Sequence, residues 1–203
     1  MLNIIFLTLL GCKAELEVET SAPGVDSASL EEVLPPIAYG IDYIEEACKH
    51  DDIGEKVCDF KFDDHLDNPW RLYEHEGKVV ILDFSAAWCG PCQAAGYYAQ
   101  PIQNDYAGEV VFVTLLLAGA ENLPTTLEDV QTWASVHGNI TSPVLQAPAE
   151  QVMDPNGVEG YAIPGLPTYI YLNQDLEIHL GHVGFSEQYM RDTIDGLLNV
   201  ESI

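Results

Sequence analysis

The sequence contains few positive charges. Its 203 residues include 7 Lys and Arg against 33 Asp and Glu, which gives a net charge of −26 at pH 7. A surface of this sign repels phosphate backbones and anionic lipid headgroups. We therefore exclude nucleic acids as partners. We interpret the acidic excess as a solvated surface; the alternatives are life at high salt and electrostatic attraction of a basic partner.

The N-terminus lacks an apolar run long enough to span a membrane. The run from Ile4 to Leu10 is about a third of the roughly 20 residues that a transmembrane helix requires. It closes with Leu9-Leu10-Gly11-Cys12 and resembles the signal peptide and lipobox of bacterial lipoproteins, in which the cysteine becomes lipidated. This resemblance implies a signal peptide over 1–12 and membrane contact through a lipid on Cys12 alone. The alternative interpretation is a core segment.

Aromatic residues are missing from 13–36, a segment that mixes Glu, Ser, Ala and Pro. Such a composition cannot bury enough apolar surface to offset the entropy of ordering the chain. We predict an acidic, disordered tether here. The whole length, with 47% hydrophobic residues, allows one core plus a tail. We therefore predict one domain over 37–203, and we expect a monomer.

The rest of the chain alternates strand-like and helix-like segments. Val79–Phe84 and Val110–Leu117 are apolar on both faces, as in parallel strands buried between layers. A capping box of Thr125 and Glu128 predicts a helix that ends at Gly138. This order predicts an α/β fold with a mixed central sheet flanked by helices. The remaining predicted elements are a hairpin of 60–62 and 70–73, a helix from 90 to about 106, a hairpin of 169–172 and 177–183, and a helix from 186.

The most informative stretch, Trp88-Cys89-Gly90-Pro91-Cys92, lies where a buried strand leads into a helix. At a helix start, unpaired N–H groups and the positive end of the helix dipole stabilise a thiolate on Cys89. Cys92 follows three residues later on the same face, so the two sulfurs can form a disulfide. Pro91 suits the first helical turn, where no backbone donor is needed. We predict a reversible Cys89–Cys92 disulfide and no separate cofactor.

Metal-ligand patterns are absent from the sequence. A zinc site would need two further close ligands, and there is no second Cys-x-x-Cys and no His-x-x-x-His. His179 and His182 fall on opposite faces of a predicted strand, which is poor geometry for a shared metal. We therefore expect no metal site.

Two segments resemble a known family. The sequence from Ile81 to Cys92, ILDFSAAWCGPC, resembles the active-site strand and helix start of thioredoxins, and the later 165–168, GLPT, resembles their cis-proline loop. The residues before the strand, an insertion at 118–157 and Val183-Gly184-Phe185 resemble the extracytoplasmic TlpA-type branch. The match covers roughly 57–200. It implies a thioredoxin-like fold with an N-terminal hairpin and an inserted helical segment.

The resemblance also implies roles for residues outside the cysteine pair. Asp83 would accept the proton when Cys92 attacks. A buried carboxylate is costly unless it is paired or its pKa is raised. The alternative is therefore that Asp83 is an exposed or paired carboxylate at the end of the strand. Pro167 would be cis and would pack against the disulfide; a trans turn proline is the alternative. The residues implied to contact an extended substrate peptide are Trp88, Gly90, Pro91, Leu166 and Thr168.

The chain departs from the family in the active-site helix. Tyr97 stands where the family commonly has a proline, and the next proline is Pro101. We expect a later kink or an earlier helix end. Gln93 replaces a residue that is usually charged, which leaves the choice of partner open.

Two further cysteines, Cys48 and Cys58, have nine residues between them. In an oxidising compartment they most simply form a structural disulfide. On the chain-entropy model, this link would stabilise the N-terminal hairpin by about 2–3 kcal/mol. The alternative is an auxiliary redox relay to the active site.

The sequence therefore predicts a thiol:disulfide oxidoreductase, lipid-anchored outside the bacterial cytoplasm, that reduces or isomerises disulfides of exported proteins rather than oxidising thiols. Its partners would be protein thiol or disulfide substrates and a membrane or soluble dithiol electron donor. Two alternatives are a peroxiredoxin-like peroxide reductase and a copper(I)-binding module. The Trp-Cys-Gly-Pro-Cys context argues against the first, and the close cysteine spacing without a partnering His argues against the second.

Overall fold

The computed structural model describes residues 34–42, 48–50 and 52–199. The predicted signal peptide over 1–12, its Cys12 and the predicted tether up to residue 33 lie outside the described residues. Within the described ranges, no helix has both the length and the apolar character needed to cross a membrane.

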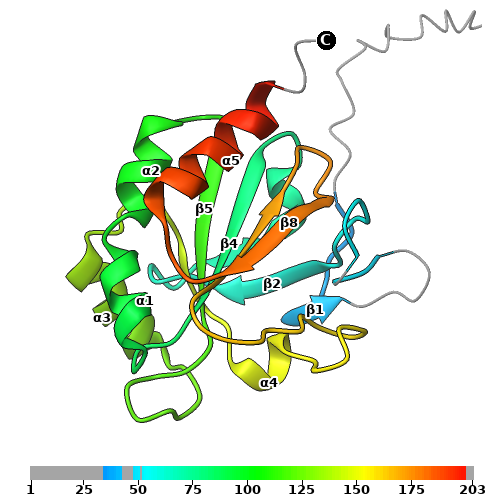
Figure 1. Cartoon of the computed structure of the whole chain (residues 1–203). Helices are drawn as coiled ribbons and strands as arrows, with labels where there is room; N and C mark the ends of the chain where they lie inside the picture. The colour runs from blue at the N-terminus through cyan, green and yellow to red at the C-terminus, as the bar shows by residue number, and fades with distance from the viewer. Residues whose placement is uncertain (1–33, 43–47, 51, 200–203) are drawn as a thin grey trace, which may run out of the picture. The chain divides into compact units, whose positions relative to one another are not determined.

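A five-stranded mixed sheet forms the centre of the fold (Figure 1), and it confirms the predicted α/β class. The strand order is β6-β5-β4-β7-β8. The first three of these strands run parallel to one another, whereas β7 is antiparallel to both β4 and β8. The strands are β4 (Val79–Ser85), β5 (Val110–Leu116), β6 (Val144–Gln146), β7 (Thr168–Leu172) and β8 (Ile178–Val183).

Both faces of the central strands are covered, which is why β4 and β5 are buried along their whole length. On one face, Val79 and Ile81 pack with residues of α2 (Ala99–Asp105) and α5 (Glu187–Asn199). On the other face, Leu82 packs with residues of a second, smaller sheet and of α4 (Ala149–Val152). The result is a helix layer, a central sheet and an N-terminal layer (Figure 1).

The N-terminal layer is a three-stranded antiparallel sheet of β1 (Gly40–Asp42), β2 (Asp59–Asp63) and β3 (Pro69–Arg71). The predicted hairpin corresponds to β2 and β3, followed by a 3-10 turn, η1 (Leu72–His75). The sequence did not reveal β1, which pairs with β2. A buried ion pair between the Arg71 guanidinium and the Asp59 carboxylate joins β3 to β2.

The active-site helix ends sooner than 106. The structure has α1 (Gly90–Gly96) and then α2, with a break at Tyr97 and Tyr98. Glycine at the end of α1 has a low helix propensity. Pro101 falls in the first turn of α2, where its missing N–H leaves no hydrogen bond unmade. A new helix start therefore accommodates this proline better than a continuous helix would.

The inserted segment contains α3 (Leu127–His137), β6 and α4, of which only α3 was predicted. Its capping box lies one residue later than predicted, with Thr126 and Asp129 in place of Thr125 and Glu128. The reason is a tertiary contact, because the Thr125 hydroxyl donates to the Leu116 carbonyl oxygen at 2.6 Å. As predicted, the helix ends at Gly138, whose φ of 75° lies in the left-handed region.

Candidate active site

The cysteine pair lies where β4 ends and α1 begins. Cys89 and Cys92 form a disulfide, and both are almost completely buried. Cys89 is the N-cap of α1, and its sulfur accepts a hydrogen bond from the Cys92 backbone N–H at 3.2 Å. The same donor would face a thiolate after reduction. The local backbone therefore favours negative charge on Cys89 rather than on Cys92.

The surroundings of this helix start support the same polarity. The first turn of α1 contains Pro91 and no acidic residue, although the chain as a whole is strongly acidic.

Gly90 and Pro91 are exposed next to the disulfide, and the Trp88 side chain is 50% exposed. A partner can therefore reach this edge of the disulfide, with an exposed indole beside it.

The peptide bond between Leu166 and Pro167 is cis. Pro167 directly precedes β7, whose first residue, Thr168, pairs with Phe84 of β4. This register places the loop at the end of β4 from which the cysteine pair follows. Leu166 packs against the buried cluster that contains both cysteines. The Thr168 hydroxyl donates to the Gly165 carbonyl oxygen at 2.6 Å and so helps to fix the loop.

Asp83 is a buried carboxylate in the middle of the sheet, and its side chain is only 2% exposed. Burial raises its pKa to about 7, although two hydroxyl groups oppose this shift. Ser85 donates to Oδ1 at 2.8 Å and Thr114 donates to Oδ2 at 3.1 Å. Thr114 lies directly opposite Asp83 on β5. The site thus contains a group that can gain or lose a proton near neutral pH.

Helix α3 supplies residues to the site that the sequence did not indicate. Trp133 and Ala134 pack in the same buried cluster as Cys89 and Cys92. The capping box predicted this helix, but not that one of its faces meets the cysteine pair. His137, at the end of the same face, also contacts the active-site helix.

Cys48 and Cys58 form a second disulfide. Both are buried, with Cys58 fully inaccessible. Cys58 directly precedes β2, so the link ties residue 48 to the N-terminal sheet. It belongs to a different part of the fold from the Cys89–Cys92 pair.

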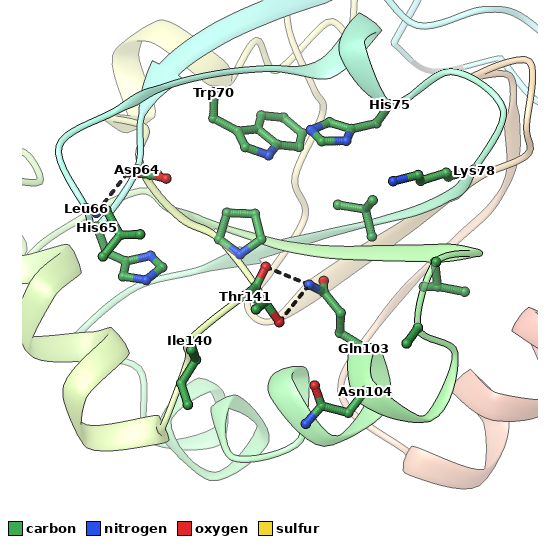
Figure 2. Close-up of a pocket in the computed structure, with 15 residues that line it drawn as sticks. Asp64, His65, Leu66, Trp70, His75, Lys78, Gln103, Asn104, Ile140 and Thr141 are labelled. Atoms are coloured by element: carbon green, nitrogen blue, oxygen red, sulfur yellow. Dashed lines mark hydrogen bonds between the residues drawn. The ribbon is translucent and has the colours of Figure 1, made fainter.

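A cavity of about 550 Å³ lies away from the cysteine pair, at the opposite ends of β4 and β5 (Figure 2). Trp70 and Lys78 line one side of it, and Gln103 of α2 lines the other. Val110 at the start of β5 also borders this cavity, whereas the cysteine pair follows the end of β4.

No group of three or more His, Cys, Asp or Glu side chains is arranged to hold a metal ion in the part of the chain that the structure describes. His179 is exposed on β8. His182 lies among the rings of Tyr169, Tyr171 and Tyr189. The two histidines thus have different environments on the same strand.

A disulfide at the start of a helix that follows a central strand, a neighbouring cis-proline loop and a buried carboxylate define a thioredoxin-like thiol–disulfide oxidoreductase. The chain belongs to the AhpC/TSA family, whose model matches residues 53–178. The matched residues include Cys58, Cys89, Cys92 and the loop at 165–168, but not Cys48.

Curated relatives have modest identity over most of the domain. The thiol-disulfide oxidoreductase ResA of Halalkalibacterium halodurans is 26% identical over 149 residues, which are 73% of this chain and 78% of that protein. The thioredoxin-like protein YneN of Bacillus subtilis is 26% identical over 70% of this chain and 78% of its own length. An H-type thioredoxin of Chlamydomonas reinhardtii is 42% identical over only 40 residues, 20% of this chain and 35% of that protein.

Solved structures share the fold. The putative thiol:disulfide interchange protein DsbE from Chlorobium tepidum has 25% identity and a TM-score of 0.55, covering 72% of this chain and 96% of that chain. A DsbF homologue from Corynebacterium diphtheriae has 17% identity and a TM-score of 0.59, covering 79% of this chain and 100% of that chain. These similarities confirm the predicted thioredoxin-like fold.

Proposed function

We propose that this protein exchanges disulfides with exported proteins outside the bacterial cytoplasm, through Cys89 and Cys92, and that it acts as a reductase or isomerase. The observation that carries this proposal is the hydrogen bond from the Cys92 N–H to the Cys89 sulfur. A donor in this place stabilises the thiolate that attacks and later leaves during exchange.

The reaction proceeds in two exchanges. The Cys89 thiolate attacks one sulfur of a substrate disulfide, a mixed disulfide forms, and the other substrate sulfur leaves as a thiolate. The Cys92 thiol then loses its proton and attacks the Cys89 sulfur. The Cys89–Cys92 bond forms and the second substrate sulfur leaves, so two electrons have passed to the substrate. An external dithiol reverses these steps and restores the reduced pair.

Asp83 is proposed as the acceptor of the Cys92 proton. With a pKa raised to about 7 by burial, it is present in both protonation states at neutral pH. Its carboxylate form can take up the proton when Cys92 attacks, and its acid form can return the proton when the pair is reduced.

The substrate is proposed to approach in an extended conformation next to Pro167. This residue is buried and cis, and Leu166 before it packs partly against the cysteine cluster. Trp88, which directly precedes Cys89, is exposed. Backbone groups of Leu166 can pair with a peptide strand, and the exposed Gly90 and Pro91, together with Thr168, are proposed to contact the same peptide.

The location outside the cytoplasm is proposed on two grounds. The Cys48–Cys58 disulfide is of the kind that persists in oxidising compartments. The N-terminal segment resembles a lipoprotein signal that ends at Cys12, and a lipid there would hold the domain at a membrane. Protein thiols and disulfides are its proposed substrates, and the proposed electron donor is a separate dithiol.

Trapping of intermediates tests the proposal. A Cys92→Ser variant is expected to accumulate mixed disulfides with protein substrates, because the second exchange is blocked. A Cys89→Ser variant, as the matched control, is expected to accumulate none. Equal trapping by both variants, or by neither, would contradict the assigned order of attack. A reduction potential on the order of −270 mV, as in thioredoxin, would fit a reductase, whereas one near −120 mV would indicate an oxidase.

A further inference from the structure

The early end of α1 leaves a backbone carbonyl to be satisfied. In a continuing helix, the Gln93 oxygen would accept from the N–H of Tyr97. In the structure this N–H is directed to the Ala95 oxygen instead, because the helix breaks at Tyr97. The Gln93 carbonyl is therefore one of the last four carbonyls of α1, which need partners from outside the helix.

His137 of α3 reaches this carbonyl. Its Nε2 lies 3.0 Å from the Gln93 oxygen, and its Nδ1 lies 2.8 Å from the Trp133 oxygen. The ring is only 5% exposed and lies against the aromatic rings of Tyr97 and Trp133, with centroids 4.7 Å and 4.3 Å away. Packing on two sides thus fixes the plane in which the imidazole can meet α1.

Gly96 shows how closely α1 and α3 approach. A Cβ atom at this position would lie 2.7 Å from Cδ2 and 2.9 Å from Cγ of His137. Real Cβ contacts are essentially never this short, so any side chain at residue 96 would displace the imidazole. The absence of a side chain there allows the contact between His137 and Gln93.

Gln93 links this contact to the reactive cysteine. Its backbone N–H donates to the Cys89 oxygen at 3.0 Å, and its side-chain amide donates to the Ala87 oxygen at 2.7 Å. Gln93 therefore holds the chain on both sides of Trp88. Hydrogen bonds in such a series strengthen one another. A shift of Gln93 would be transmitted to the turn that contains Cys89.

We propose that His137 is a positioning residue for the cysteine pair: through Nε2 it donates to the Gln93 carbonyl and so holds the active-site turn and α1 in the orientation that stabilises the Cys89 thiolate. This inference rests on the proposed function of the pair. Both ring nitrogens face carbonyl oxygens, which only accept, so a hydrogen bond to either oxygen requires an N–H on the nitrogen that faces it; the proposal places one on Nε2, toward Gln93. Glu128, Asp129 and Thr132 of α3 line a small pocket together with His137.

Two substitutions separate hydrogen bonding from packing. His137→Phe keeps a ring between Tyr97 and Trp133 but removes both ring nitrogens. His137→Gln places an amide donor near the position of Nε2. The matched control is His179→Phe, because His179 is exposed on β8, away from α1.

The measurement is the alkylation rate of reduced Cys89 against pH in the full-length chain, followed by mass spectrometry of the peptide that contains it. Loss of one hydrogen bond in the series is expected to lower the rate at pH 7 roughly three- to tenfold in His137→Phe, with the midpoint of the profile shifted upward. His137→Gln is expected to recover most of the rate, and His179→Phe to match the wild type.

The outcomes are distinct. A His137→Phe profile identical to that of the wild type would overturn the inference. A shift in His137→Phe that His137→Gln fails to reverse would also overturn it, because ring packing alone would then explain the effect. If the wild-type pair itself does not exchange with glutathione, the proposed function fails instead, whatever the two variants show.

Discussion

Burial of Asp83 makes the stability of the oxidised protein depend on pH. Its pKa is about 7 in the folded chain against a reference value of 3.8. Between these values the folded protein holds a proton that the unfolded chain has lost, so stability falls as pH rises, by about 1.4 kcal/mol per pH unit. Over the roughly three units of this window the loss reaches about 4 kcal/mol and is complete above pH 7.

An Asp83→Asn variant removes this dependence because the amide does not ionise. Relative to wild type, its stability is expected to be between unchanged and about 2 kcal/mol lower at pH 4, and about 2–4 kcal/mol higher at pH 8. The lower figure allows for the loss of one acceptor, since Ser85 and Thr114 both donate to the carboxylate and an amide offers only one oxygen. At the same time, the proposed proton acceptor for Cys92 is lost and disulfide exchange should slow.

Urea unfolding of the oxidised protein at pH 4, 6 and 8, followed by far-UV circular dichroism, measures the effect. Asp175→Asn is the matched control, because this substitution removes the same charge at a residue that is exposed in the turn before β8. A stability difference between Asp83→Asn and wild type that is the same at all three pH values would refute the reasoning. So would a gain of equal size in the control.

Three further changes test the surrounding structure. Thr114→Val removes one donor to the Asp83 carboxylate, so the pKa of Asp83 should rise by about one unit. The pH profile of disulfide exchange should shift upward with it, and an unchanged profile would contradict the role of the hydroxyl. Replacing Cys48 and Cys58 together by Ala should lower the free energy of unfolding by about 2–3 kcal/mol and leave exchange kinetics intact, whereas a loss of exchange would indicate a relay. Gly138→Ala should cost about 1 kcal/mol, measured by thermal unfolding, because φ at this position is 75°.

The elements that the sequence predicted are those with a strong local signal. The runs over 79–84 and 110–117 are apolar on both faces, and the structure has β4 and β5 there. The hairpin of β7 and β8 was also predicted, from its turn residues, and so was the helix after residue 186. In contrast, β1 and β6 have three residues each and exist only because they pair with distant strands. Such short segments have no period that a sequence can show.

Tertiary contacts explain the shifted boundaries. Thr125 and Thr126 are equally good helix caps by residue type. The structure uses Thr126 because the Thr125 hydroxyl is buried and donates to the Leu116 carbonyl oxygen at the end of β5, nine residues earlier. Likewise, the break after Gly96 brings α1 against His137, which is 41 residues further along the chain. Local propensity cannot choose between two adjacent boundaries when the deciding partner lies in another element.

The same limit applies to the active site. The cysteine pair and Asp83 were recognisable because one strand and one helix start carry all three. The contribution of α3 was not, since the sequence predicted only a helix that ends at Gly138 and gave no sign that Trp133 or His137 meets the site. The roles of these groups differ accordingly. Ionisation of the buried Asp83 lowers stability, a cost that its proposed role in proton transfer would explain. The contacts of α3 with the cysteine cluster are apolar or hydrogen-bonded and carry no such cost. Removing the Asp83 carboxylate should therefore raise stability and lower the exchange rate, whereas changes in α3 should lower both.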